Sequence, residues 1–191
     1  MSRARPRVFI ESLARLKDWT GNRIVDFPKP TIAAVNGYAI GAGSLMSLCC
    51  DLVIASDRAE WRMPQASLGI TASYGCYARM PRRVGKGDVM RAAFGFPISA
   101  AEALRIGLAQ WLVPHEDFRA RTMEIAHHIA GLAPLSARLI KESVNRSAEI
   151  GNTNEAALVD LYRLMVLEQT EDSKEAHEAW RERRPAKFTG R

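Results

Sequence analysis

Short apolar runs, separated by glycine and proline, fill the first part of this chain. Residues 31–35 are continuously apolar and follow two prolines, and residues 52–55 form a second such run, so both predict buried strands. Between them, Asn36-Gly37 marks a turn, and Gly41-Ala42-Gly43 opens an apolar segment, residues 44–50, that predicts a short buried helix. A strand, a glycine-rich turn, a helix and another strand indicate a crossover connection between parallel strands.

The pattern becomes mostly helical after Pro81. Ser99 and Glu102 have the spacing of a capping box, and Gly107 is placed to end that helix. Residues 108–113 predict a last short strand, which Pro114 closes.

Three apolar stripes at helical spacing follow, and then a charged amphipathic segment over residues 172–184. The stripes are Phe118, Thr122, Ile125, Ala126 and Ile129; then Leu135, Leu139 and Val144 in a helix that begins at Pro134; then Leu158, Leu161 and Met165. Since no linker separates the halves, we predict an α/β core over residues 1–114 that continues into a helical region over residues 115–191.

The first residues allow two interpretations. They are rich in arginine and contain no acid before Glu11, as in a transit peptide. Phe9, Leu13, Leu16 and Trp19 also recur at helical spacing, and this favours a surface helix because the segment runs into the core without a break.

Composition and charge exclude several classes of function. The chain has 191 residues, 47% hydrophobic and 25% charged, with a net charge of +6, and no apolar run is long enough to cross a membrane. The three cysteines lack metal-ligand spacing, so we expect reduced thiols, no metal site and a cytoplasmic protein, or one of the mitochondrial matrix. The basic residues are scattered except for Arg79, Arg82, Arg83 and Lys86, and no nucleic-acid-binding motif accompanies them, so RNA binding remains only a third option.

The turn Gly41-Ala42-Gly43 carries the most chemical information. Small residues let a ligand approach the backbone, and the start of a helix presents N–H groups without intrahelical partners. Such groups bind anions or stabilise the negative charge of an enolate, as in an oxyanion hole. Alternatively, the small residues serve only close packing of strand and helix. A phosphate-binding loop is less favoured, because no Lys-Ser/Thr pair follows the last glycine.

An ordered set of motifs resembles the crotonase superfamily, the enoyl-CoA hydratase/isomerase family. The central signature is KPTIAAVNGYAIGAGS over residues 29–44, followed by CDLVIAS over residues 50–56. The other matching segments are Met63-Pro64, residues 68–70, 81–85 and 98–103, Gly107-Leu108, and residues 171–175 and 183–188. The resemblance covers nearly the whole chain from Lys29 onward.

This resemblance implies a ClpP/crotonase-like spiral of ββα units whose C-terminal helices form trimers or hexamers and close over the ligand. It also implies an acyl-CoA thioester as substrate, a lyase or isomerase reaction of fatty-acid metabolism, and no permanently bound cofactor. The Ala42 N–H takes the position of one oxyanion-hole donor, and Gly41 and Gly43 shape the turn. Lys187 and Phe188 take positions that contact the nucleotide of CoA.

Two departures from the family pattern change the expected reaction. The paired glutamates of hydratases fall at Leu45 and Gln65, and neither side chain exchanges a proton at neutral pH. The family's first ββα units, which supply the second oxyanion donor, have no counterpart, so we expect an N-terminally truncated spiral with an open sheet edge.

We therefore expect an acyl-CoA-binding protein whose oxyanion hole stabilises an enolate-like state. The expected reaction is decarboxylation, isomerisation or hydrolysis, with Gln65, Ser73 and Tyr74 as further polar contacts. Ser44 is another candidate contact. Alternatively, Tyr74 and Tyr77 are core aromatics and Ser73 caps a helix. The alternative function is a catalytically inactive, truncated paralogue that serves as a partner subunit.

Overall fold

The computed structural model describes residues 19–147 and 149–191, so most of the predicted helix through Phe9, Leu13 and Leu16 lies outside the described residues. The chain forms two compact units. The first contains residues 31–122 together with residues 19–27, and the second contains residues 123–191 together with residues 28–30. The units divide between residues 122 and 123, within a helix, whereas the pattern predicts a boundary between residues 114 and 115. The buried Phe118 therefore belongs to the first unit.

Two small sheets organise the first unit. One has the strand order β1-β3-β6 and the other β2-β4-β5. The strands are β1 (Ile32–Val35), β2 (Tyr38–Ile40), β3 (Leu52–Ser56), β4 (Glu60–Arg62), β5 (Ile98–Ser99) and β6 (Trp111–Val113). The predicted parallel pairing is confirmed, because β1 lies parallel to β3 in a register that runs from Ile32 opposite Leu52 to Val35 opposite Ala55.

The predicted strand over residues 108–113 is too long, since β6 begins only at Trp111. Leu108 and Ala109 are buried in the connection before it. Gln110 explains the late start. Its N–H donates to the Val53 carbonyl oxygen at 2.9 Å, but the Val53 N–H donates to the Gln110 side-chain oxygen at 2.8 Å and so is taken by a side chain instead of a backbone carbonyl.

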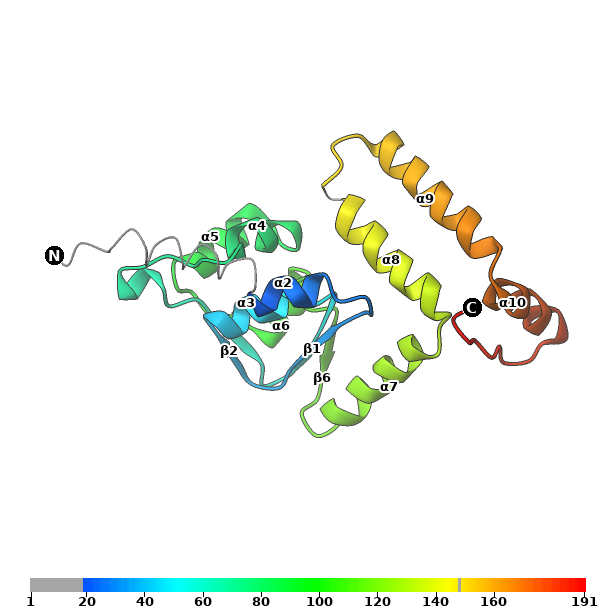
Figure 1. The fold of residues 1–191 in the computed structure, drawn as a ribbon. Coiled ribbons are helices and arrows are strands. Elements are labelled where there is room, and N and C mark those ends of the chain that lie inside the picture. The colour runs from blue at the N-terminus through cyan, green and yellow to red at the C-terminus, as the bar shows by residue number, and fades with distance from the viewer. Residues whose placement is uncertain (1–18, 148) are drawn as a thin grey trace. The chain divides into compact units, whose positions relative to one another are not determined.

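Short helices surround these sheets, and α2 and α3 lie side by side (Figure 1). The helices of the first unit are α2 (Thr20–Val25), α3 (Ala42–Cys49), α4 (Cys76–Arg79), α5 (Lys86–Ala93) and α6 (Ala100–Arg105), with 3-10 turns η1 (Ala66–Leu68) and η2 (Met80–Arg82). The predicted cap of α6 is confirmed, because the Ser99 Oγ accepts from the Glu102 N–H. The Glu102 carboxylate pairs with Arg91 and Arg105.

The second unit is helical, as the stripes predict. α7 (Phe118–Ala130) leads from the first unit into α8 (Pro134–Ser147), α9 (Thr153–Glu168) and α10 (Glu171–Glu182). α8 and α9 lie side by side (Figure 1), and the Arg163 Nη1 of α9 donates to the Ser143 Oγ of α8 at 2.7 Å. Within residues 19–147 and 149–191, no helix is long and apolar enough to span a membrane.

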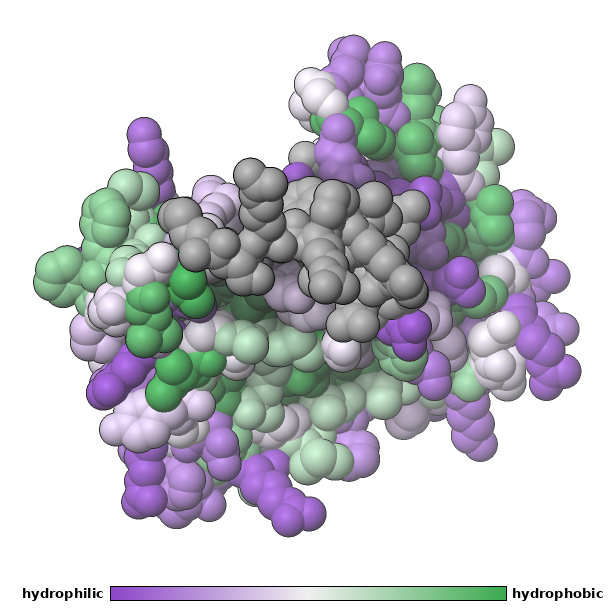
Figure 2. All heavy atoms as spheres, turned by 60° about the vertical axis from the view of Figure 1, so that its left-hand side comes forward, coloured by the Kyte–Doolittle hydropathy of each residue, from purple (hydrophilic) through white to green (hydrophobic). Residues whose placement is uncertain are grey.

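Many large apolar side chains are exposed in both units, and on the face drawn in Figure 2 apolar residues reach the surface among polar ones. The stripe of α9 is one such set, with Leu158, Leu161 and Met165 all exposed. Val144 of α8 is exposed as well, so this residue of the predicted second stripe does not enter the core.

Candidate functional site

The glycine-rich turn joins β2 to α3. Gly41 has φ 54° and ψ −106°, a conformation that residues with a Cβ rarely adopt, and it is the N-cap of α3. Its N–H donates to the Arg62 carbonyl oxygen at 2.8 Å, and its own carbonyl accepts from the Leu45 N–H at 3.1 Å. These two bonds fix the turn to β4 on one side and to the first turn of α3 on the other.

The amides of Ala42 and Gly43 are available to a ligand. Both residues are exposed, and neither N–H donates a hydrogen bond to any of the described residues. They stand at the positive end of the α3 dipole, where an anionic oxygen is stabilised. The turn therefore has the two properties that an oxyanion donor needs, an unpaired N–H and access from outside.

A cavity of about 10 Å³ lies behind the turn, lined by Ser44, Leu48, Trp61 and Met63 among others. This is roughly the smallest space that admits one water molecule. This cavity is therefore too small to hold an acyl group.

The structure supports a packing role for Ser44 in place of the predicted contact with substrate. Ser44 is buried, and its hydroxyl donates to the Ala39 carbonyl oxygen at 2.6 Å and lies 3.2 Å from the Arg62 carbonyl oxygen. Its side chain fastens the first turn of α3 to β2 and β4.

The two positions that carry glutamates in hydratases lie next to the turn. Leu45 is 6% exposed and belongs to the core cluster, so this position supplies no polar group. Gln65 lies beside the turn, because its Nε2 is 3.4 Å from the position that a Cβ of Gly41 would take. The Gln65 Oε1 is buried and has no hydrogen-bond partner in the described part of the chain. The structure thus brings Gln65 together with Gly41, Ala42 and Gly43.

Ser73 and Tyr74 lie further along the same segment, before α4. Both are exposed, and Tyr74 and Tyr77 retain 44% and 40% of their accessible surface, so the alternative of core aromatics is wrong. Ser73 is not a side-chain cap either, because Gly75 is the N-cap of α4 and no side chain bonds there. The Tyr74 ring instead stacks on Trp19, with ring centroids 5.1 Å apart.

Two members of the basic cluster have structural partners. The Arg83 guanidinium donates to the carbonyl oxygens of Leu48 and Cys50, at the end of α3, and burial lowers the pKa of Arg83. Arg79 donates to the Tyr74 carbonyl oxygen and to the Asn22 Oδ1. The sequence does not predict these contacts, because the partners lie up to 57 positions away along the chain. With two arginines bonded within the protein, fewer basic groups of the cluster are available to bind RNA.

The cysteines are poor candidates for a nucleophile. Cys49 and Cys76 are buried, and all three cysteines are free thiols. Burial raises the pKa of the Cys49 and Cys76 thiols, so at neutral pH both are protonated.

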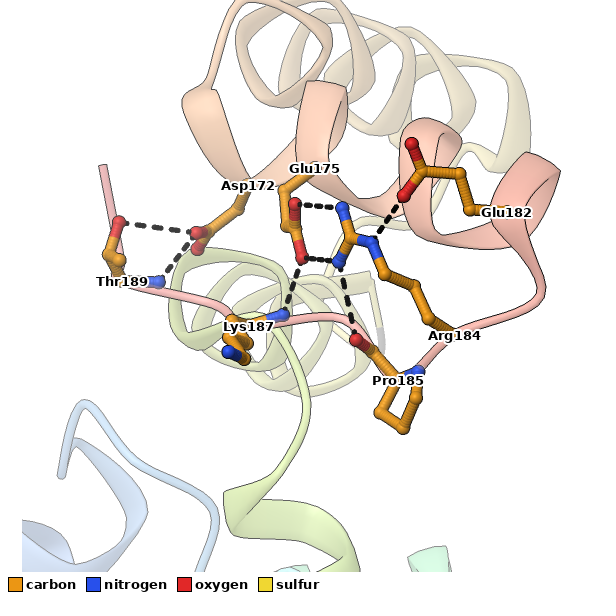
Figure 3. A network of polar contacts seen from close by, with 7 residues as sticks. All are labelled: Asp172, Glu175, Glu182, Arg184, Pro185, Lys187 and Thr189. Carbon is orange, nitrogen blue, oxygen red and sulfur yellow. Dashed lines mark hydrogen bonds and ion pairs between the residues drawn. The ribbon is translucent and has the colours of Figure 1, made fainter.

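Lys187 and Phe188 lie in the last segment of the second unit. Figure 3 shows this segment returning along α10, where the Lys187 N–H donates to the Glu175 Oε1 at 2.7 Å. A hollow of about 410 Å³ lies here, lined by Glu171, Asp172, Glu175, Arg184, Lys187 and Thr189. Lys187 is exposed and Phe188 is half-buried.

Comparison with known proteins gives concordant matches. A family model described as enoyl-CoA hydratase/isomerase matches residues 12–191. A short-chain-enoyl-CoA hydratase of Clostridium acetobutylicum is 37% identical over 157 residues, which are 82% of this chain and 60% of that protein. A crotonyl-CoA hydratase of Syntrophomonas wolfei is 35% identical over 161 residues, 84% of this chain and 62% of that protein.

Solved structures agree. The crystal structure of an enoyl-CoA hydratase from Bacillus anthracis matches the whole chain with a TM-score of 0.90 at 28% identity, and the match covers 73% of that chain. The chain spans 60–67% of the length of the curated relatives that it matches.

Proposed function

Because the chain belongs to the enoyl-CoA hydratase/isomerase family and has its α/β fold, as the sequence predicts, we propose that it binds an acyl-CoA thioester whose carbonyl oxygen accepts a hydrogen bond from the Ala42 N–H. One observation carries this proposal: the Ala42 and Gly43 amides are exposed, unpaired among the described residues, and held at the start of α3. Negative charge on a thioester oxygen is stabilised at such a position.

The reaction proceeds through an enolate and is not ordinary hydration. Adding water to a double bond requires a group that takes a proton from the water, and neither Leu45 nor Gln65 does so. Decarboxylation makes the fewest demands: when the bond between the α-carbon and the carboxylate breaks, its electron pair forms the enolate, which then takes a proton from water, so no catalytic base is needed. Isomerisation and hydrolysis each require a further proton acceptor.

The other candidate residues have supporting roles in this proposal. Gly41 and Gly43 shape the turn, and Gln65, Ser73 and Tyr74 offer polar groups to the acyl part. Lys187 and Phe188 contact the nucleotide of CoA. No resident cofactor takes part.

A second candidate function is that of a catalytically inactive paralogue that acts as a partner subunit. Leu45 favours it, since a buried leucine replaces a catalytic carboxylate where a polar side chain would be expected in an active hydratase. In both cases we propose a homotrimer or hexamer built on the helical region. The exposed stripe of Leu158, Leu161 and Met165 supports this, because apolar surface of that kind commonly marks a subunit interface.

Binding of acetyl-CoA, measured by calorimetry, tests the proposal. S-ethyl-CoA, which lacks the carbonyl oxygen, should bind more weakly to the wild-type protein. Ala42→Pro removes the N–H at the first helical position, where proline is tolerated, and should weaken acetyl-CoA binding about 3- to 10-fold. Ala42→Ser keeps the N–H and is the matched control. Equal affinity for acetyl-CoA and S-ethyl-CoA would contradict the proposal.

Activity and assembly separate the two candidate functions. Malonyl-CoA and methylmalonyl-CoA should lose carbon dioxide, while crotonyl-CoA should take up no water. If acetyl-CoA binds but none of these thioesters reacts, the inactive paralogue is the better description. Light scattering with and without acetyl-CoA gives the oligomeric state, and a monomer in both conditions contradicts the trimer.

A further inference from the structure

Three side chains and a carbonyl group form a compact cluster around Arg79. The guanidinium Nη1 donates to the Tyr74 carbonyl oxygen at 2.7 Å, and Nη2 donates to the Asn22 Oδ1 at 2.9 Å. The guanidinium carbon lies 5.7 Å from the centre of the Trp19 ring, and that ring stacks on Tyr74. Arg79 therefore ties the turn before α4 to α2 through a rigid fork of donors and a cation–π contact.

The turn that Arg79 holds has an unfavourable backbone. Tyr74 has φ 55°, in the left-handed region that a bulky aromatic residue rarely adopts, and Gly75 follows with φ 77°. Such a conformation persists only where its surroundings enforce it. Gly75 also leaves the space that Arg79 uses, since a Cβ there would lie 2.3 Å from the Arg79 Nη1.

The segment before this turn begins at the proposed ligand site. Gln65 lies against Gly41, and its carbonyl oxygen accepts from the Ile70 N–H at 3.0 Å. In between, Leu68 and Ile70 are 67% and 62% exposed, so they do not anchor the segment in the core. Residues 66–74 are thus held at their start by Gln65 and at their end by Ala72, which packs on the core, and by the Arg79 cluster.

We propose that Arg79 is a positioning residue, which holds residues 66–74 beside the Gly41 turn in the arrangement that acyl-CoA binding requires. This inference rests on the proposed function, because the ligand that it concerns is the thioester at Ala42. Arg79 itself touches no ligand and acts through the Tyr74 carbonyl and the Trp19 ring.

Arg79→Met and Arg79→Lys test the inference, with Arg82→Met as the control. Arg82 is exposed on η2, carries the same charge and has no partner among the described residues. Arg79→Met should raise the Kd of acetyl-CoA roughly tenfold, while Arg82→Met should change it less than about twofold. Arg79→Lys keeps the charge near Trp19 but lacks the fork, so its Kd should lie between the two.

Hydrogen exchange of residues 66–74, measured without ligand, reports how firmly this segment is held and does not depend on whether acetyl-CoA binds. Arg79→Met should speed exchange in this segment and leave α5 and α6 unchanged, which also shows that the variant is folded. Unchanged exchange overturns the inference, as does faster exchange with an unaltered Kd. If the wild-type protein does not bind acetyl-CoA, the proposed function fails and the inference fails with it, whereas binding that Arg79→Met leaves intact overturns the inference alone.

Discussion

The guanidinium of Arg184 donates two hydrogen bonds to the carboxylate of Glu175, at 2.6 and 2.9 Å, and so fastens the end of the chain to α10 (Figure 3). The Lys187 N–H donates to the same carboxylate. Arg184, and after it the Lys187 N–H, lowers the pKa of Glu175 to about 2. The ionised Glu175 carboxylate therefore helps to hold the segment that carries Lys187 and Phe188.

The first prediction concerns pH. Because the folded-state pKa of Glu175 lies below its ordinary value of 4.5, the stabilisation is complete above about pH 4.5 and is lost as the pH falls toward about 2. The chemical shift of the Lys187 amide should titrate with a midpoint near 2, because this amide donates to Glu175. In Glu175→Gln that titration should disappear. Glu178→Gln is the control: Glu178 is exposed, and the titration should persist in this variant. A midpoint between 4 and 5 contradicts the expected ion pair.

A second carboxylate holds the last residues. Asp172 is 3% exposed, and its carboxylate accepts from the N–H groups of Thr189 and Gly190 at 2.7 and 2.9 Å. Asp172→Asn places an NH2 group against one of these donors, so we expect a loss of about 1–3 kcal/mol in the free energy of unfolding. Urea unfolding gives this value.

Glu171→Gln is the control for Asp172→Asn. Glu171 also lies in the first turn of α10 but is exposed, so its replacement removes the same charge from the helix dipole without opposing two donors. A change within about 0.5 kcal/mol is expected. Equal losses in both variants would assign the effect to the dipole and not to the bonds with Thr189 and Gly190.

The sequence predicts the segments whose structure is set locally. The runs at residues 31–35 and 52–55 form β1 and β3, as predicted. Only β3 is buried, however: β1 lies at the edge of its sheet, where Ala34 is exposed and its other residues are half-buried. The cap at Ser99 and the helix that begins at Pro134 were predictable because caps act within one turn, although the Glu102 carboxylate pairs with Arg91 and Arg105 and no bond completes the capping box.

The sequence does not predict the features that need distant partners. β2 and β4 have three residues each and pair across 22 positions, so each shows only one buried side chain and no period. The contact of Gln65 with Gly41 and the Arg79 cluster likewise depend on tertiary packing. The motif located the turn at Ala42, but only the structure gives the neighbours that surround it.

A third prediction follows from the buried hydroxyl of Ser44. Ser44→Ala removes the buried hydrogen bond to the Ala39 carbonyl oxygen, at a cost of about 0.5–1.5 kcal/mol in the free energy of unfolding. The Kd of acetyl-CoA, measured well below the melting temperature, should change less than about twofold, because the hydroxyl is buried and already donates to the Ala39 carbonyl oxygen. Ser67→Ala, which removes an exposed hydroxyl bonded to the Pro64 carbonyl oxygen, should cost less than about 0.5 kcal/mol. Weaker acetyl-CoA binding in Ser44→Ala alone would show that Ser44 is a ligand contact after all.

The fourth prediction compares the two glycines that flank Ala42. Gly41→Ala forces a residue with a Cβ to φ 54°, places that Cβ 3.4 Å from the Gln65 Nε2, and should cost about 1–3 kcal/mol of stability. Since Gly41 directs the Ala42 N–H, acetyl-CoA should also bind more weakly. Gly43→Ala is the control, because a Cβ there meets nothing within 4 Å and the residue is helical, so stability should hold or rise slightly. Calorimetry with both variants decides whether the turn serves ligand binding or only close packing. If Gly41→Ala loses stability but keeps its affinity for acetyl-CoA, the glycine serves packing, and the Ala42 amide is not the donor that the ligand uses.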